Sequence, residues 1–261
     1  MRKLFIVFLI LIWFESFSQE SADSLKKYSY FTNGANYEDT TGHYCFIQGT
    51  GFFIKQNGRK RYISAKHVLL NCNYNGEQTG CRPDKIMVFY NDNDKVRIGL
   101  TWRFDITKFT KTHDCSPVYK SPDTITVLKE DTNSIYSIEH LIPSKPIKSL
   151  GEIVIYGFPL TKNIKSGWYT LRQASKISSK DFAFDSSFFV ADKKGVLQKD
   201  LVNYRLFLND YRITPELGGF SGSPVFAFDI EDKRWYFLGI LSAIDPVRNL
   251  LFIVKAKYII N

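Results

Sequence analysis

The sequence is poor in several features that define other classes of protein. It has only 2 Met and 4 Cys among 261 residues, no internal repeat and no low-complexity tract. No long segment keeps the 3.6-residue period of an amphipathic helix, and no apolar run after residue 14 approaches the length of a membrane span. With 44% hydrophobic and 23% charged residues, these absences exclude a disordered, collagenous or coiled-coil chain and favour a packed globular one.

The N-terminus has the pattern of a secretory signal peptide. Two basic residues precede an apolar run of eleven residues, 4–14, and the small residues Ser16 and Ser18 follow at alternate positions. A membrane anchor is the alternative, but eleven residues at about 1.5 Å rise do not cross a hydrocarbon core of about 30 Å. We therefore expect residues 1–18 to be removed. The mature chain, beginning at Gln19, is expected to be secreted or periplasmic and to have no membrane span.

Export makes the four cysteines candidates for disulfide bonds. They are Cys45, Cys72, Cys81 and Cys115. Cys72 and Cys81 bracket a short polar loop and are the favoured pair, and Cys45 with Cys72 is the alternative. No cysteine spacing matches a zinc site, and the four His residues form no metal-binding pair on a helix. We expect no metal and no cofactor.

The net charge of +9, from 35 basic and 26 acidic residues, raises the question of a nucleic-acid ligand. The basic residues are spread through loops, as at 145–148 and 193–194, and no zinc-finger or RNA-binding motif accompanies them. A carbohydrate- or nucleic-acid-binding β-domain is therefore the weakest hypothesis, and we expect no nucleic-acid partner.

The aromatic residues indicate β-structure. The chain has 22 Phe and 15 Tyr, and its β-branched and aromatic residues gather in short runs between turn signals. Runs 51–55 and 60–65 are joined by Asn57-Gly58, a strong hairpin signal because both residues tolerate positive φ. Further runs predict strands at 86–90, 96–102, 125–129, 152–156, 169–177, 182–190, 204–208, 224–228, 236–242 and 250–254.

A break near residues 140–150, with two prolines and no periodicity, divides these strands into two groups. Two small all-β units are therefore favoured over one large sheet. We predict the first unit over residues 42–140 and the second over 141–261. The polar, turn-rich residues 19–41 are predicted to form an N-terminal arm.

The first candidate for chemistry is the segment GGFSGSPVF at residues 218–226. Its three glycines allow a tight turn without Cβ clashes, and such a turn can aim the hydroxyl of Ser221 outward. The amides of Gly219 and Ser221 can then converge on one point, as an oxyanion hole requires. The alternative is a Gly/Ser/Pro surface turn that leads into a strand.

The second candidate is His67, in the segment YISAKHV at 62–68, which follows the strand-like GTGFFI at 49–54. A single His is more often a surface or core residue, so its significance depends on the serine motif. Together, G-x-S-G-S-P and the earlier S-A-x-H resemble the motifs of the chymotrypsin-like (trypsin-fold) serine peptidases, in particular the bacterial G-x-S-G-S-P branch. The resemblance covers residues 45–261.

The resemblance implies a fold of two packed six-stranded antiparallel β-barrels, with the active site in the cleft between them. It implies Ser221 as the nucleophile, His67 as the general base, and the amides of Gly219 and Ser221 as the oxyanion hole. Thr214, Pro215 and Glu216 before the nucleophile, and Ser242 and Ala243 after it, would frame the substrate pocket. No side-chain preference follows from them.

The third catalytic residue, an acid, matches the family less directly. The family places Asp immediately before an apolar strand, whereas here Thr124 precedes the strand 125–128 and Asp123 lies one residue earlier. We expect Asp123 to be the acid, with Asp105 and Asp114 as alternatives. A second departure is Phe220, where the family carries Asp or Asn. Since Phe220 cannot pair with a newly formed N-terminus, activation by that route is not expected, and its ring is predicted to pack near the nucleophile and alter substrate access.

The sequence therefore predicts an exported, monomeric serine endopeptidase that hydrolyses protein or peptide substrates through an acyl-enzyme. The alternative is a catalytically impaired trypsin-fold binding protein that uses the same cleft. The displaced acid and Phe220 favour this alternative.

Overall fold

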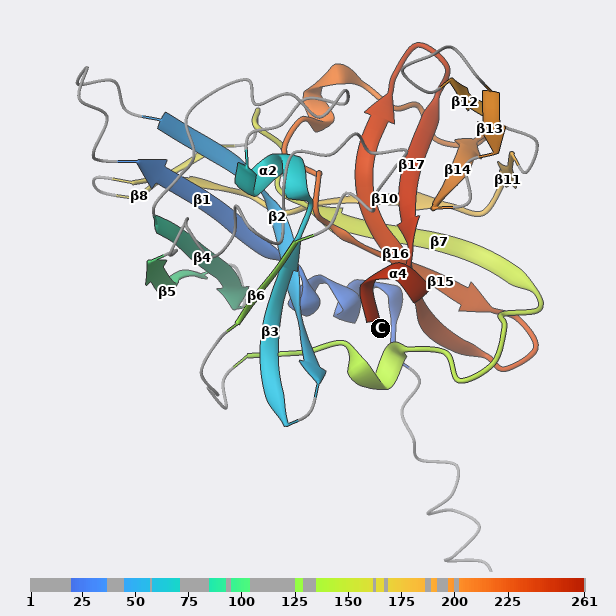
Figure 1. The fold of residues 1–261 in the computed structure, drawn as a ribbon, viewed down its shortest axis with the longest axis horizontal. Coiled ribbons are helices and arrows are strands. Elements are labelled where there is room, and N and C mark those ends of the chain that lie inside the picture. Colours follow the sequence, from blue (N-terminus) through green and yellow to red (C-terminus); the bar gives the residue numbers. More distant parts are fainter. Residues whose placement is uncertain are drawn as a thin grey trace, which may run out of the picture.

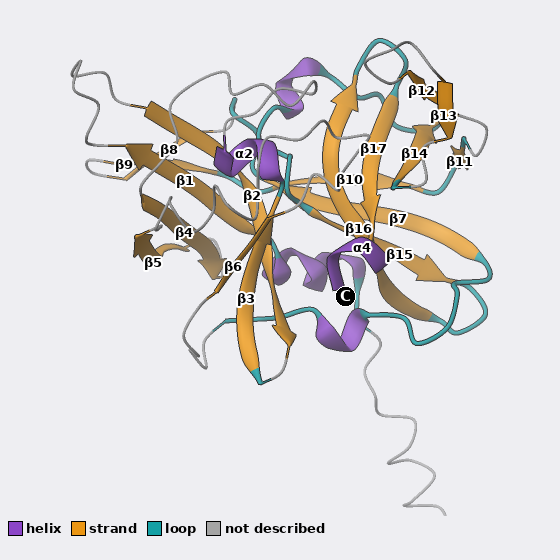
Figure 2. Cartoon of the chain, in the orientation of Figure 1, coloured by secondary structure: helices purple, strands orange, loops and turns teal. Residues whose placement is uncertain are grey.

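The structure, a computed structural model, consists mainly of β-strands with a few short helices (Figures 1 and 2). It describes residues 20–36, 45–56, 58–70, 85–92, 95–103, 125–128, 135–161, 163–166, 169–185, 189–191, 197–199 and 202–260. The predicted signal peptide lies outside the described residues. Within those residues, no helix has the length and apolar character needed to cross a bilayer.

The first sheet has six antiparallel strands in the order β5-β4-β1-β2-β3-β6. The predicted hairpin is confirmed: Gln56 pairs with Arg59 across the two-residue turn, and Gly58 has a φ of 75°. The strands are β1 (Tyr30–Asn36), β2 (Cys45–Gln56), β3 (Arg59–Ser64), β4 (Lys85–Asp92), β5 (Lys95–Arg103) and β6 (Ile125–Leu128).

Much of the predicted N-terminal arm belongs to this folded unit. The 3₁₀-helix η1 (Ala22–Tyr28) begins after Ser21, whose side chain accepts a hydrogen bond from the amide of Ser24. The next strand, β1, lies between β2 and β4 in the sheet. The prediction of an arm was wrong for this part of the chain, because backbone pairing on both sides of β1 outweighs the turn-forming character of its residues.

The second sheet has seven antiparallel strands, one more than predicted, in the order β10-β7-β15-β16-β17-β14-β11. Each strand contributes inward apolar side chains to one core cluster, so the sheet must curl around that cluster (Figure 1). The strands are β7 (Leu150–Gly157), β10 (Ser175–Ser179), β11 (Phe182–Phe184), β14 (Asn203–Leu208), β15 (Pro224–Asp229), β16 (Arg234–Asp245) and β17 (Leu250–Lys255).

The two sheets pack against each other through a second apolar cluster. Phe52 of β2 lies with its ring centroid 5.1 Å from that of Phe237 of β16, and Leu25 and Tyr28 of η1 are buried in the same cluster. Side chains on β7 alternate between the two clusters, since Ile155 faces the inside of the second sheet and Val154 faces the first sheet. This interface holds the two sheets in a fixed relation.

The remaining elements are short. Two small antiparallel pairs join β8 (Asn163–Ser166) to β9 (Tyr169–Arg172) and β12 (Phe189–Ala191) to β13 (Leu197–Lys199). The short helices are α2 (Lys66–Leu70), η2 (Glu139–Leu141), η3 (Pro215–Leu217) and α4 (Lys257–Ile260).

Candidate active site

The loop that carries Ser221 runs from η3 to β15 and depends on two glycines. Gly219 and Gly222 have φ values of 99° and 91°, in the left-handed region that favours glycine. A Cβ atom at Gly222 would overlap the carbonyl oxygen of Thr50 and press on the hydroxyl of Ser64, both in the first sheet. The sequence pattern G-x-S-G therefore allows the loop of the second sheet to lie directly against the backbone of the first.

Thr50 is the main link between this loop and the first sheet. Its backbone N–H donates to the carbonyl of Ser221 at 2.9 Å, and its hydroxyl donates to the carbonyl of Gly219 at 2.8 Å. The same hydroxyl accepts from the amide of Phe158 at 3.2 Å, and the hydroxyl of Ser64 donates to the carbonyl of Thr50 at 2.7 Å. Thr50 thus fixes the backbone on both sides of Phe220 from the opposite sheet.

The backbone amides of the loop alternate in their hydrogen bonding. Phe220 N–H donates to Leu217 O at 3.1 Å, and Gly222 N–H donates to Leu241 O at 2.7 Å. For the amides of Gly219 and Ser221, no backbone carbonyl in the described part of the chain is an acceptor. These are the two amides predicted to form the oxyanion hole.

His67 is the second residue of α2, three residues after the end of β3 at Ser64, and it is half-buried. Its helix begins where the serine loop meets the first sheet: a Cβ at Gly222 would lie 3.0 Å from the amide nitrogen of Ala65. The side chain of Val68, the next residue after His67, covers Gly49. A Cβ atom at Gly49 would also lie 3.1 Å from the carbonyl oxygen of Ser221. Two segments that are far apart in the sequence thus meet at one junction.

The hydroxyl of Ser221 donates to the backbone carbonyl of Ser242 at 3.3 Å. The register of β16 against β17 shifts between Leu241 and Ala243, which makes Ser242 the extra residue of a β-bulge. Bulges bend a strand and redirect its carbonyl groups. The bulge thus brings part of the predicted substrate-binding strand to the predicted nucleophile.

The other predicted substrate-pocket residues lie around the same loop. Thr214 is half-buried and its carbonyl accepts from the amide of Leu217 at 3.2 Å, which caps η3. Pro215 and Glu216 follow in η3, and the Glu216 side chain is exposed, while Ala243 is half-buried beside the bulge. These positions frame the Ser221 loop without defining a side-chain preference.

Phe220 is fully buried in the core of the second sheet. Its ring lies over Gly157, where a Cβ would come within 2.5 Å of the ring. The prediction that it packs near the nucleophile agrees with this position, but the ring points into the core and not toward a substrate. Its burial gives an apolar support to the loop where the family carries a polar residue.

Several predicted residues lie outside the described part of the chain. They include all three candidate acids, Asp105, Asp114 and Asp123, and the cysteines Cys72, Cys81 and Cys115. Cys45 is the first residue of β2, but its side chain is not described, so the disulfide pairing stays a prediction.

The sequence alone did not indicate a role for Thr50 or Ser64, although they lie in the segments 49–54 and 62–68 considered with His67. A polar residue between two glycines on a strand that is otherwise buried was the available signal for Thr50. Both side chains are fully buried, and buried hydroxyls need partners. Their partners lie on the Ser221 loop and could not be identified from local sequence.

The two packed antiparallel sheets, with the serine loop of one held against the middle of β2 and the end of β3 in the other, form the all-β fold of the trypsin-like serine proteases. Among solved structures, this chain is similar to GrC, with a TM-score of 0.52 and 13% identity over 91% of this chain and 92% of that chain. It is also similar to AL20, a thermostable serine protease from an extremophilic microorganism, with a TM-score of 0.49 and 12% identity over 90% and 93% of the chains.

At 13% identity the likeness to GrC shows the fold alone. No protein-family model matches the sequence, and no curated protein matches it either. The bacterial G-x-S-G-S-P branch therefore stays a prediction.

Proposed function

We propose that this protein is an exported serine endopeptidase, with Ser221 as nucleophile and His67 as general base. The observation that carries the proposal is the docking of the Ser221 loop on Thr50 and Ser64, at the junction where α2 begins with His67. A serine hydroxyl needs a base to take its proton near neutral pH, and a base on the opposite sheet can approach it at this junction.

In the proposed reaction, the Ser221 oxygen attacks the carbonyl carbon of a peptide bond while His67 takes the hydroxyl proton. The negative charge that develops on the carbonyl oxygen is stabilised by the amides of Gly219 and Ser221. His67 then gives its proton to the leaving amine, and an acyl-enzyme remains until water hydrolyses it. Thr214, Pro215, Glu216, Ser242 and Ala243 would contact the substrate around Ser221.

We propose Asp123 as the acid that orients His67. Strand β6 begins at Ile125, which pairs with Ser64, three residues before His67. Two residues of extended chain span at most about 7 Å, so Asp123 lies within that reach of Ile125. Asp105 and Asp114 remain the alternatives, and Asp123→Asn is expected to lower the rate of acylation by roughly 10⁴ if Asp123 is the acid.

A second candidate function is that of a catalytically impaired protein that binds peptides at the same site. The hydrogen bond from the Ser221 hydroxyl to the carbonyl of Ser242 favours it, because a backbone carbonyl cannot take up the proton. For catalysis, the hydroxyl must turn from this carbonyl toward His67.

Labelling with a fluorophosphonate probe distinguishes the two functions. The mature protein should form a covalent adduct at Ser221, located by peptide mass spectrometry, and Ser221→Ala should abolish it. Ser223→Ala is a matched control in the same motif, since no hydrogen-bond partner of its hydroxyl is found within the described structure. Folded wild-type protein that takes up no label, but binds peptides, would exclude the peptidase and support the binding protein.

Export is tested separately. Expression of the full-length chain in a bacterial host should yield a processed protein outside the cytoplasm whose N-terminus, by mass spectrometry, is Gln19. An unprocessed chain retained in the cytoplasm would contradict the proposal.

A further inference from the structure

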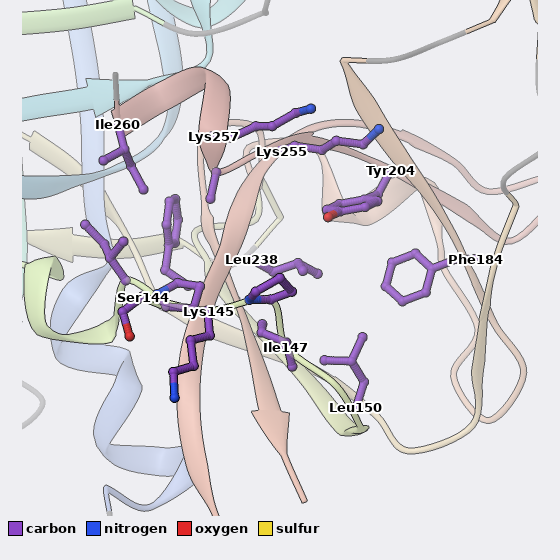
Figure 3. A pocket seen from close by; sticks show the side chains of 15 residues that line it. Ser144, Lys145, Ile147, Leu150, Phe184, Tyr204, Leu238, Lys255, Lys257 and Ile260 are labelled. Carbon is purple, nitrogen blue, oxygen red and sulfur yellow. The ribbon is translucent and has the colours of Figure 1, made fainter. Parts of the chain in front are cut away.

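A pocket of about 560 Å³ lies on the second sheet, between the segment 142–150 and the C-terminal helix α4 (Figure 3). Its size is within the range of sites that hold small organic ligands. Leu238, on β16, lines the pocket and is four residues before Ser242, or about 13 Å along a strand. The pocket is therefore separate from the candidate active site.

The body of the pocket is apolar. Its walls include side chains of the segment 142–150, of β16, of β11 and of α4, among them Ile147, Leu150, Phe184, Leu238 and Ile260. Ile147, Leu150 and Phe184 also pack against the core of the second sheet, which fixes this wall from behind. A ligand that fills this space must have an apolar body.

The rim of the pocket is cationic. Lys255 and Lys257 lie on one side and Lys145 on the other (Figure 3), and none of the lining residues that the structure describes is acidic. The Lys255 ammonium group lies 5.0 Å from the centroid of the Tyr204 ring, which holds it beside the pocket. Charge complementarity therefore favours a ligand with an anionic head group.

Four of the residues around the pocket have no backbone N–H to offer a peptide. Pro143 and Pro146 have no N–H, and the amides of Lys255 and Ala256 already donate to Val202 O and Leu238 O at 3.1 and 3.0 Å. A peptide group placed against these four residues would find no backbone N–H donor there, and burial of an unpaired peptide group is unfavourable. An alkyl chain carries no such groups.

We propose that this pocket binds a fatty acid, with the alkyl chain between Leu238 and Phe184 and the carboxylate at the lysines of the rim. This site is independent of the catalytic function proposed above. A peptidase, or an inactive binding protein of the same fold, would carry it equally.

The first test is the affinity of the mature protein for octanoate, decanoate and dodecanoate, measured by calorimetry below the concentrations at which micelles form. A methylene buried in the pocket should tighten binding by about fourfold. Dodecanol and dodecylammonium, with the same chain, should bind at least about tenfold more weakly than dodecanoate. Equal affinity for the three head groups, no dependence on chain length, or no binding would overturn the proposal.

The second test locates the site without changing the core. The triple variant Lys145→Gln, Lys255→Gln, Lys257→Gln should bind dodecanoate about tenfold more weakly, with unchanged affinity for dodecanol. Lys180→Gln, at an exposed lysine elsewhere on the second sheet, is the control and should bind as the wild type does. Ser144→Trp, which places a ring at the exposed rim of the pocket, should weaken binding of both ligands.

Thermal melts establish that each variant is folded. Fluorophosphonate labelling of the triple variant at the wild-type rate, together with weakened dodecanoate binding, separates this site from the catalytic one. Dodecanoate binding that is unchanged in both the triple variant and Ser144→Trp would exclude this pocket.

Discussion

The backbone N–H of Thr50 donates to the carbonyl of Ser221 at 2.9 Å, although the two residues belong to different sheets. This bond and the one from the Thr50 hydroxyl to Gly219 O hold the Ser221 loop at two points. An oxyanion hole depends on amides that already point at the developing charge, since reorientation during the reaction would cost free energy. Thr50 is therefore a positioning residue for the proposed oxyanion hole.

Thr50→Val tests this role. The substitution keeps the side-chain shape and removes the hydroxyl, which leaves the carbonyl of Gly219 and the amide of Phe158 without this partner. We expect fluorophosphonate labelling to slow by roughly 10- to 100-fold, and the free energy of unfolding to fall by about 1–3 kcal/mol. Thr50→Ser should restore most of the labelling rate.

Thr32→Val provides the matched control. Thr32 is equally buried in the first sheet, and its hydroxyl is hydrogen-bonded to Tyr62 and not to the Ser221 loop. It should lower the free energy of unfolding by a similar amount while the labelling rate stays near that of the wild type. Equal effects of the two substitutions on labelling would show that Thr50 acts only through stability.

Gly222→Ala is expected to be far more damaging than Gly58→Ala. Both glycines have positive φ, so both substitutions carry a backbone cost of about 1–2 kcal/mol. Within the described residues, nothing apart from its chain neighbours lies within 4 Å of a Cβ at Gly58, whereas a Cβ at Gly222 overlaps Thr50 O. Urea unfolding should therefore show a loss of about 1–2 kcal/mol for Gly58→Ala and at least about 3 kcal/mol for Gly222→Ala. Similar losses would mean that the loop can move away from the first sheet.

The class of fold could be predicted from the sequence, but not every strand. The β2–β3 hairpin was predicted because Asn57-Gly58 is a local signal, and a local signal does not need the rest of the chain. Strand β1 was missed because its sequence, YFTNGAN, is rich in turn residues, and only its pairing with two neighbours makes it a strand. The predicted run 169–177 is divided into β9 and β10, which pair with different strands.

At the candidate site, too, residues with a local sequence signal were predicted, and residues that depend on distant contacts were not. Ser221 and His67 stand in motifs whose glycines and small residues are visible locally. Thr50 acts through a hydrogen bond to a residue 169 positions away, and no local pattern predicts such a partner. The burial of Phe220 depends likewise on Gly157, which leaves room for its ring on a strand of the second sheet.

Glu20 gives the protein a predictable dependence of stability on pH. Its carboxylate accepts from Lys27 Nζ and from the Tyr28 hydroxyl, both at 2.6 Å. Partial burial alone would raise the pKa of Glu20, but these hydrogen bonds and the charge of Lys27 outweigh it and lower the pKa below its ordinary value of 4.5. The ionised carboxylate therefore stabilises the fold above about pH 4.5, and this contribution is lost as the pH falls through the lowered pKa.

Glu20→Gln should accordingly reduce the free energy of unfolding at pH 7, and the difference from the wild type should shrink as the pH falls below about 4.5. Urea unfolding at pH 7, 5, 4 and 3 measures this difference. Glu216→Gln, at an exposed carboxylate, serves as the control for stability and should show no such convergence. A difference that grows toward acid pH would contradict the assignment of a lowered pKa to Glu20.

Phe220 supports the Ser221 loop through apolar packing, so the stability of the protein depends strongly on the residue type at position 220. The ring is fully buried in the core of the second sheet, against Gly157, so a carboxylate there would have to be buried among apolar groups. Phe220→Leu should lower the free energy of unfolding by about 1–2 kcal/mol. Phe220→Asp, which restores the residue type of the resembling family, should lower it by at least about 4 kcal/mol or prevent folding. If Phe220→Asp instead folds with wild-type stability and labels at Ser221, the loop must be able to present this position to water or to a cationic partner.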